Sequence, residues 1–122
     1  MFEFNDESPI YIQIANTIED GILNGIYEEE EQVPSTTEIS VTYKINPATV
    51  GKGYNLLVGD NIIYKKRGVG MFVCSGAKEK KKKKIRATFF DNYVSKLIED
   101  WKRLGITSDE VIEMIKRGLS NE

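Results

Sequence analysis

Residues 34–74 read PSTTEISVTYKINPATVGKGYNLLVGDNIIYKKRGVGMFVC, and this stretch decides the expected fold. It contains two helix starts. Ser35 with Glu38 three residues later is a capping box, which begins a first helix. Asn46-Pro47 places a cap residue before a proline at the first helical position, which begins a second helix. About three residues join the two helices, as in a helix-turn-helix.

A short β-hairpin is predicted directly after the second helix. Asn61 is a suitable left-handed cap for that helix. Residues 62–66 and 71–74 have the composition of two short strands, and Arg67-Gly68-Val69-Gly70 between them supplies the glycines of a tight turn. The hairpin takes the place of the wing in a winged helix-turn-helix.

A further helix is predicted upstream. Ser8-Pro9 supplies an N-cap followed by a proline at the first helical position, and Asn24-Gly25 ends the helix. Its apolar residues recur at helical spacing and are Tyr11, Ile14, Ala15, Ile18 and Ile22. The acidic run at residues 28–31 is interpreted as a solvated turn.

Residues 85–119 predict two amphipathic helices. The first begins at Ile85 and ends at Leu104-Gly105, and the second begins at the capping box of Thr107 and Glu110. Two helices cannot bury so broad an apolar face by themselves. The face must pack on the N-terminal domain or on the same unit of a second chain, and we favour the second chain. The residues assigned to this homodimer interface are Phe89, Phe90, Tyr93, Val94, Leu97, Trp101, Leu104, Val111, Ile112 and Ile115.

These elements predict a mainly α fold with a small β-hairpin. Residues 1–76 are expected to form a winged helix-turn-helix domain that binds DNA. Residues 77–122 are expected to form a two-helix hairpin that serves as a dimerisation unit.

Charge is unevenly distributed along the chain. The net charge is −2, yet residues 1–33 carry nine acidic residues and no basic residue. Residues 34–77 carry five basic and two acidic residues, and residues 78–122 carry twelve basic and eight acidic residues. The basic character therefore begins where the predicted helix-turn-helix begins, which suits a nucleic-acid partner.

Histidine is absent and Cys74 is the only cysteine. Histidine is the commonest metal ligand and general base, so zinc sites and Ser-His-Asp centres of the usual kind are excluded. We expect no enzyme, no metal and no cofactor. No apolar run approaches the roughly 20 residues of a membrane span, and the N-terminus lacks the basic segment of a signal peptide. A cytoplasmic protein without a membrane partner is therefore expected.

The candidate DNA contacts lie in three segments. In a helix-turn-helix the second helix enters the major groove by its N-terminal residues, and hydroxyls at the start of the preceding helix meet phosphates. A basic hairpin tip suits the minor groove. The candidates are Asn46, Pro47, Ala48, Thr49 and Lys52 in the second helix, Ser35, Thr36 and Thr37 before it, and Lys66, Arg67, Gly68, Val69 and Gly70 in the wing.

Each segment also has a purely structural interpretation. Ser35 and Asn46 cap helices whether or not they touch DNA, and the wing is also consistent with an ordinary exposed hairpin. The lysine run at residues 80–84 is either a solvated helix start or a non-specific phosphate contact. Gly51 and Gly53 each cost about 1 kcal/mol of helix stability relative to alanine. We attribute them to the close approach of a neighbouring helix or of DNA.

Taken together, these motifs resemble the GntR family of bacterial regulators over residues 9–73. The motifs are Pro9-x-Tyr11-x-Gln13, Ile22-x-x-Gly25, Val33-Pro34-Ser35, Asn46-Pro47-Ala48-Thr49-Val50, Lys52-x-Tyr54, Leu57 and Lys66-Arg67-Gly68-Val69-Gly70-Met71-Phe72-Val73. The short C-terminal part is similar to the YtrA subfamily. This resemblance implies a two-helix dimerisation unit, repression, and a frequent association with genes of ABC transporters.

The chain departs from the family pattern at informative positions. Thr37 stands where the family usually has an arginine that contacts DNA. Gly51 and Gly53 stand where alanines are usual, and Asn61 replaces the usual glycine before the first wing strand. Operator affinity is therefore expected to depend more on Lys52, the wing and the lysine run at residues 80–84.

The resulting hypothesis is a homodimeric, sequence-specific repressor that binds double-stranded operator DNA containing a palindrome or inverted repeat. One alternative is a winged-helix module for protein–protein assembly. Another is a sensor whose aromatic C-terminal face, with Phe89, Phe90, Tyr93 and Trp101, holds a hydrophobic effector. The sequence identifies no effector, operator or regulated gene.

Overall fold

The structure is a computed structural model that describes residues 2–121. It separates into two compact units that divide between Lys82 and Lys83. This division lies inside a helix, whereas the boundary predicted from the sequence follows residue 76. Each unit is described by itself below.

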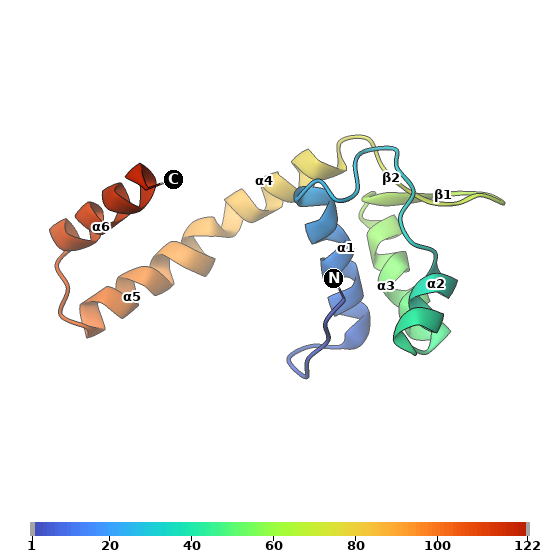
Figure 1. The fold of residues 1–122 in the computed structure, drawn as a ribbon, viewed down its shortest axis with the longest axis horizontal. Coiled ribbons are helices and arrows are strands. Elements are labelled where there is room, and N and C mark those ends of the chain that lie inside the picture. The colour runs from blue at the N-terminus through green and yellow to red at the C-terminus, as the bar shows by residue number, and fades with distance from the viewer. Residues whose placement is uncertain (1, 122) are drawn as a thin grey trace. The chain divides into compact units, whose positions relative to one another are not determined.

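The first unit has the element order of a winged helix-turn-helix, which confirms the predicted fold class. Three helices precede an antiparallel hairpin, and a fourth helix begins after it (Figure 1). The elements are α1 (Ile10–Leu23), α2 (Thr36–Tyr43), α3 (Pro47–Gly59), β1 (Ile63–Lys66), β2 (Gly70–Val73) and α4 (Ala77–Phe89).

The starts of α2 and α3 confirm the cap residues predicted from the sequence. The Ser35 hydroxyl accepts the backbone N–H of Glu38 at 3.0 Å, and the Glu38 carboxylate accepts the backbone N–H of Ser35 at 3.4 Å. The Asn46 side chain accepts the N–H of Ala48 at 2.8 Å. Asn61 has a φ of 57°, as expected of a left-handed residue after α3.

The start of α1 differs from the prediction. Pro9, not Ser8, holds the N-cap position, with a ψ of 143°, and α1 begins at Ile10. An extended ψ keeps Pro9 outside the helix, so the proline precedes the first turn instead of opening it. At this end of the helix, the Gln13 side-chain amide donates a hydrogen bond to the Ser8 carbonyl at 2.6 Å.

The hairpin pairs β1 with β2 in antiparallel register, from Ile63 opposite Val73 to Lys66 opposite Gly70. A third segment, absent from the sequence-based prediction, lies beside β2. Gln32 forms an isolated bridge with Phe72, and the Val33 N–H donates to the Met71 carbonyl at 2.9 Å. Residues 32–33, just before α2, therefore support the wing through their contacts with β2.

The acidic run 28–31 is exposed, but it is more than the solvated turn predicted from the sequence. The Tyr64 hydroxyl donates to Glu30 Oε2 at 2.5 Å, and this bond raises the pKa of Tyr64. The Gly76 N–H donates to Glu29 Oε1 at 2.9 Å. These carboxylates therefore attach the run to the wing and to the residue before α4.

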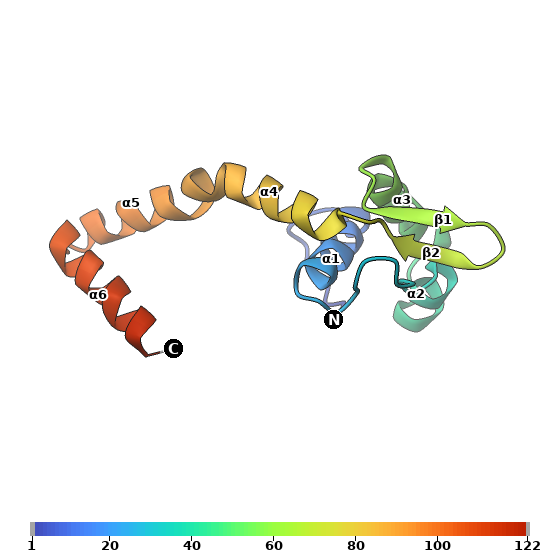
Figure 2. The same ribbon diagram turned by 90° about the horizontal axis from the view of Figure 1, so that it is seen from above.

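The core of the first unit lies between α1, α3 and the hairpin. Helices α1 and α3 lie side by side (Figures 1 and 2). The side chains with no exposed surface are Ile14, Ile18, Val50, Leu57 and Val73. The apolar spacing predicted for the upstream helix thus marks the buried face of α1, where Ile14, Ala15, Ile18 and Ile22 are buried and Tyr11 is half-buried.

The second unit contains the rest of α4, a π-helical turn η1 (Phe90–Val94), α5 (Ser95–Arg103) and α6 (Ser108–Ser120). Helix α4 begins at Ala77, not at Ile85 as predicted, because alanine and lysine are good helix formers and Ala77 is buried. The π-helical turn was not predicted. Within it, the Asn92 amide donates to the hydroxyl of Thr88 in the preceding turn at 3.3 Å. Within residues 2–121, no helix has the length and apolar character needed to cross a lipid bilayer.

Candidate nucleic-acid interface

The N-terminal end of α3 presents polar and small residues to the surface. Asn46, Pro47, Ala48 and Lys52 are exposed, and Thr49 is half-buried. Asn46 caps the helix, which leaves the Thr49 hydroxyl and the Lys52 ammonium as the groups here best suited to contact a base edge or a phosphate.

Lys52 is positioned by α1. Its Nζ lies 4.1 Å from the centroid of the Tyr11 ring. A cation over an aromatic face is attracted by the ring quadrupole. This contact therefore restricts the side-chain conformations of Lys52 while its ammonium stays near the surface. Lys52 was predicted from the sequence as a DNA contact, whereas its contact with Tyr11 is seen only in the structure.

The two glycines of α3 have different surroundings. A Cβ placed on Gly53 would lie 2.7 Å from the backbone oxygen of Tyr11 and 3.3 Å from Ile14 Cβ. A Cβ placed on Gly51 would meet no atom of the described residues within 4 Å. Gly53 is therefore required by the close approach of α1 and α3, whereas packing within the chain does not require Gly51.

The wing is a basic turn with left-handed glycines. Gly68 has a φ of 76° and Gly70 a φ of 148°, which are conformations that favour glycine. Lys66, Arg67, Gly68 and Val69 are exposed, and the hairpin tip projects beyond the neighbouring helices (Figure 2). The Lys66 ammonium lies 4.6 Å from the Phe72 ring centroid.

Gln32 supports the wing and was missed by the sequence analysis. Its amide donates to the Val69 carbonyl at 3.2 Å, and its side chain lies directly against the Cα of Gly70, where a Cβ would overlap it. Gln32 is 37 residues from Val69 in sequence, so no local pattern could have connected the two.

A hollow of about 380 Å³ joins the start of α2, the outer face of α3 and the hairpin. It is lined by Ser35, Thr36, Gly51, Tyr54, Asn55, Val58, Lys65, Gly70 and Met71. Of the residues selected from the sequence, Ser35, Thr36 and Gly70 line this hollow. The candidates at the start of α3 and the remaining wing candidates, Lys66, Arg67, Gly68 and Val69, lie outside its lining. Asn55 and Lys65 also border it, although neither was among the candidate contacts.

Tyr54 fixes the inner wall of this hollow. Its hydroxyl donates to the Pro34 carbonyl just before α2, and burial raises the pKa of Tyr54 above its ordinary value near 10. The bond ties α3 to the start of α2. The position of Ser35, Thr36 and Thr37 relative to α3 is thereby set.

The sequence profile described as "Bacterial regulatory proteins, gntR family" matches residues 10–73, from α1 to the end of β2. The chain belongs to this family. The GntR-family chain is therefore a helix-turn-helix transcription regulator that binds DNA, and its relatives are regulators rather than enzymes.

Three relatives extend the similarity of this GntR-family chain beyond the winged helix. The chain is 30% identical over 109 residues to the HTH-type transcriptional repressor YtrA of Bacillus subtilis, covering 89% of this chain and 83% of YtrA. It is 28% identical over 116 residues to the uncharacterized HTH-type regulator YhcF of the same bacterium, covering 93% of each. A GntR-family regulator from Bacteroides thetaiotaomicron matches in structure with a TM-score of 0.70 and 38% identity, covering 92% of this chain and 97% of that one.

In the GntR-family chain the second unit carries the residues assigned to a dimer interface. The exposed ones are Phe89, Phe90, Tyr93, Leu97, Leu104, Ile112 and Ile115. Val94 and Trp101 are half-buried, and Val111 is buried within the unit. A hollow of about 270 Å³ between α5 and α6 is lined mainly by apolar residues, Trp101 and Val111 among them, together with Asp100.

Proposed function

We propose that this GntR-family regulator is a homodimeric repressor that reads an inverted repeat in operator DNA. In each copy residues 46–52 enter a major groove, and the wing at residues 66–70 enters the adjacent minor groove. The observation that carries the proposal is the single concave surface bordered by the start of α2, α3 and the wing.

The charge on this surface supports the assignment. Lys65, Lys66 and Arg67 lie together on the hairpin and are exposed, and arginine is favoured by the negative potential of a narrow minor groove. Because Thr37 replaces the arginine usual in the family, the hydroxyls of the α2 start contribute phosphate contacts without a charge. Affinity then depends on Lys52 and the wing.

The second unit supports dimerisation. Its exposed apolar residues include three aromatic side chains, Phe89, Phe90 and Tyr93. Apolar surface of this kind is unfavourable in water, and a second copy supplies a matching face by a twofold axis. A twofold protein also suits a twofold DNA site.

Repression and the type of target operon are proposed from similarity. YtrA of Bacillus subtilis, whose similarity extends over 89% of this chain, is named a repressor. We extend this role to the present chain, acting in the cytoplasm on an operon such as one that encodes an ABC transporter.

A gel-shift experiment tests the proposal. The full-length protein is titrated onto duplex DNA from the region upstream of its own gene, with excess unrelated duplex as competitor, at moderate salt. We expect a specific shift with the stoichiometry of two chains per duplex, and footprinting should reveal an inverted repeat. Failure to shift any upstream duplex more strongly than the competitor contradicts the proposal.

The hollow beside Trp101 supports a second candidate, a hydrophobic effector bound by the second unit. Its lining residues include Leu97, Leu104 and Ile115, and a small apolar compound suits such a site. Trp101 is the only tryptophan of the chain, so its fluorescence reports on binding. If no candidate compound changes that fluorescence, the hollow is a part of the dimer interface alone.

A further inference from the structure

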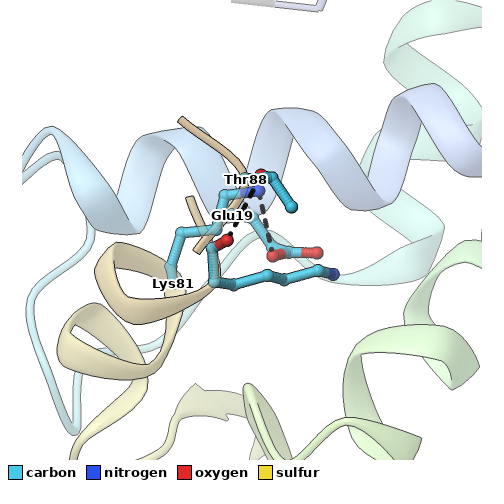
Figure 3. A network of polar contacts seen from close by, with 4 residues as sticks. Glu19, Lys81 and Thr88 are labelled. Atoms are coloured by element: carbon cyan, nitrogen blue, oxygen red, sulfur yellow. Dashed lines mark hydrogen bonds and ion pairs between the residues drawn. The ribbon is translucent and has the colours of Figure 1, made fainter. Parts of the chain in front are cut away.

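One lysine of the run 80–84 is withdrawn from the surface. Lys81 Nζ lies 3.2 Å from Oε2 of Glu19 on α1, and the two side chains are only 14% and 8% exposed (Figure 3). The other four lysines of the run are exposed. Lys81 is therefore neither part of a solvated face nor available to DNA.

The energetics of this ion pair indicate a role in geometry. Removing a carboxylate and an ammonium from water costs several kcal/mol for each ion, and their attraction roughly offsets that cost. Two apolar side chains at the same place would stabilise the contact about as well, but they tolerate sliding and rotation. Because the two charges must meet, the ion pair favours one position of α4 along α1 over its neighbours.

Two other contacts hold the same end of α4. The Lys80 ammonium donates to the Asp60 carbonyl at the end of α3. The Gly76 N–H donates to Glu29 Oε1 at 2.9 Å, and Ala77 is buried in the core. The first turn of α4 is thus fixed to α1, to the end of α3 and to the acidic run, all within the unit that carries the DNA-binding elements.

We propose that Glu19 and Lys81 are positioning residues that set the direction in which α4 leaves the DNA-binding unit and, through it, the preferred spacing of operator half-sites. The inference rests on the proposed function, since only a dimer on an inverted repeat has a spacing to select. Helix α4 has 13 residues and is therefore about 20 Å long. A change of about 10° at its base moves its far end by about 3.5 Å, close to the rise of one base pair.

The test uses the full-length protein and a series of duplexes. Each duplex carries the footprinted half-site as an inverted repeat, and the spacer between half-sites varies one base pair at a time. Gel shifts give the ratio of affinity between the best spacer and its neighbours. The variants are Lys81→Met, which keeps the apolar stem, and the double variant Glu19→Met/Lys81→Met, which leaves no unpaired carboxylate. Lys83→Met is the matched control, because it removes one exposed lysine of the same run.

We expect the discrimination between spacers to fall by about fivefold or more in both Lys81 variants, an effect of about 1 kcal/mol. Lys83→Met should keep the wild-type ratio even if its overall affinity is lower. The exchanged pair Glu19→Lys/Lys81→Glu should recover part of the ratio, which a purely structural loss would not explain.

Two results overturn the inference in different ways. A double variant that melts cooperatively, dimerises and keeps the wild-type spacer profile shows that the pair is only structural. A wild-type protein that is monomeric, or that binds single and inverted half-sites equally, removes the proposed function and this inference with it.

Discussion

Gly53 of α3 lies against the backbone carbonyl of Tyr11 in α1, so close that a Cβ at Gly53 would come within 2.7 Å of that oxygen. The contact joins the two largest helices of the DNA-binding unit at the place where Tyr11 also carries the Lys52 ammonium. The helix crossing that requires Gly53 therefore also positions Lys52, a proposed DNA contact.

Substitution of the two α3 glycines should have opposite effects on stability. Gly53→Ala forces α1 and α3 apart and should lower the free energy of unfolding by about 1–3 kcal/mol, the range for overpacked cores. Gly51→Ala has open space around the added methyl and should raise stability by about 1 kcal/mol. Urea unfolding of both variants measures this, and a stabilised Gly53→Ala protein contradicts the packing argument.

Removal of Lys52 or Arg67 should weaken operator binding and its dependence on salt. Each side chain that neutralises a phosphate contributes about one unit to the slope of log affinity against log salt. Lys52→Ala and Arg67→Ala should each flatten the slope by about one unit in gel shifts at several salt concentrations. Lys44→Ala, an exposed lysine outside the proposed contacts, is the control. An unchanged slope excludes the altered residue from the interface.

Tyr11→Leu should act on DNA binding through Lys52. The variant keeps an apolar side chain but removes the ring beneath the ammonium. Exposed cation–π contacts are worth about 0.5–1 kcal/mol, so we expect a loss of operator affinity of a few-fold with the salt slope retained. In a Lys52→Ala background the same change should have little further effect. Additive losses would indicate that the two residues act independently.

Stability should fall at alkaline pH because of Tyr54. Its folded-state pKa is raised above the ordinary value near 10, so above that pH the unfolded chain loses a proton that the folded chain keeps. The free energy of unfolding therefore decreases as pH rises past about 10. Tyr54→Phe should weaken this decrease, and at neutral pH it should cost about 1 kcal/mol for the bond lost to Pro34. Urea titrations between neutral pH and pH 11 compare the two, and parallel pH profiles contradict the assignment.

Gln32→Ala should weaken DNA binding more than it weakens the fold. The exposed side chain contacts the wing through the Val69 carbonyl and Gly70. We expect a melting temperature close to that of the wild type and an affinity loss of several-fold, because a wing without this support adopts more conformations before binding. Glu31→Ala, next to Gln32 and exposed, is the control. Equal effects of both variants contradict a specific role for Gln32.

An acidic residue on α6 should separate the proposed dimer. Ile115 is 50% exposed, and Ile115→Asp would place a charge in an apolar interface, which costs several kcal/mol unless it is paired. Sedimentation should show a monomer for Ile115→Asp and a dimer for the neighbouring surface variant Lys116→Asp. A dimeric Ile115→Asp protein places the interface elsewhere.

The sequence predicted those parts of the fold that depend on local chemistry. The cap residues Ser35, Asn46 and Thr107 accept the expected backbone N–H groups, because a capping side chain and its partner lie within three residues of each other. The start of α1 was misplaced by one residue, because the backbone of Pro9 turns extended just before the helix.

Long-range relationships could not be predicted. The contacts of Gln32 with the wing, of Tyr54 with Pro34 and of Glu19 with Lys81 each join residues that are distant in the chain. The lysine run appeared uniform in the sequence, although one lysine of the five is half-buried and forms an ion pair with Glu19. The π-helical turn at residues 90–94 likewise has no signature in the apolar spacing.

The sequence by itself therefore determined the order of helices and strands and the buried face of α1, because these follow from spacing and capping within a few residues. Its motifs indicated the family by their resemblance to the GntR pattern. Only the tertiary structure decided which of the two glycines serves helix packing, how Lys52 and the wing are held, and which lysine of the run pairs with Glu19 of α1. Those outcomes depend on side chains that meet across the fold, and their partners are set by packing rather than by proximity in the chain.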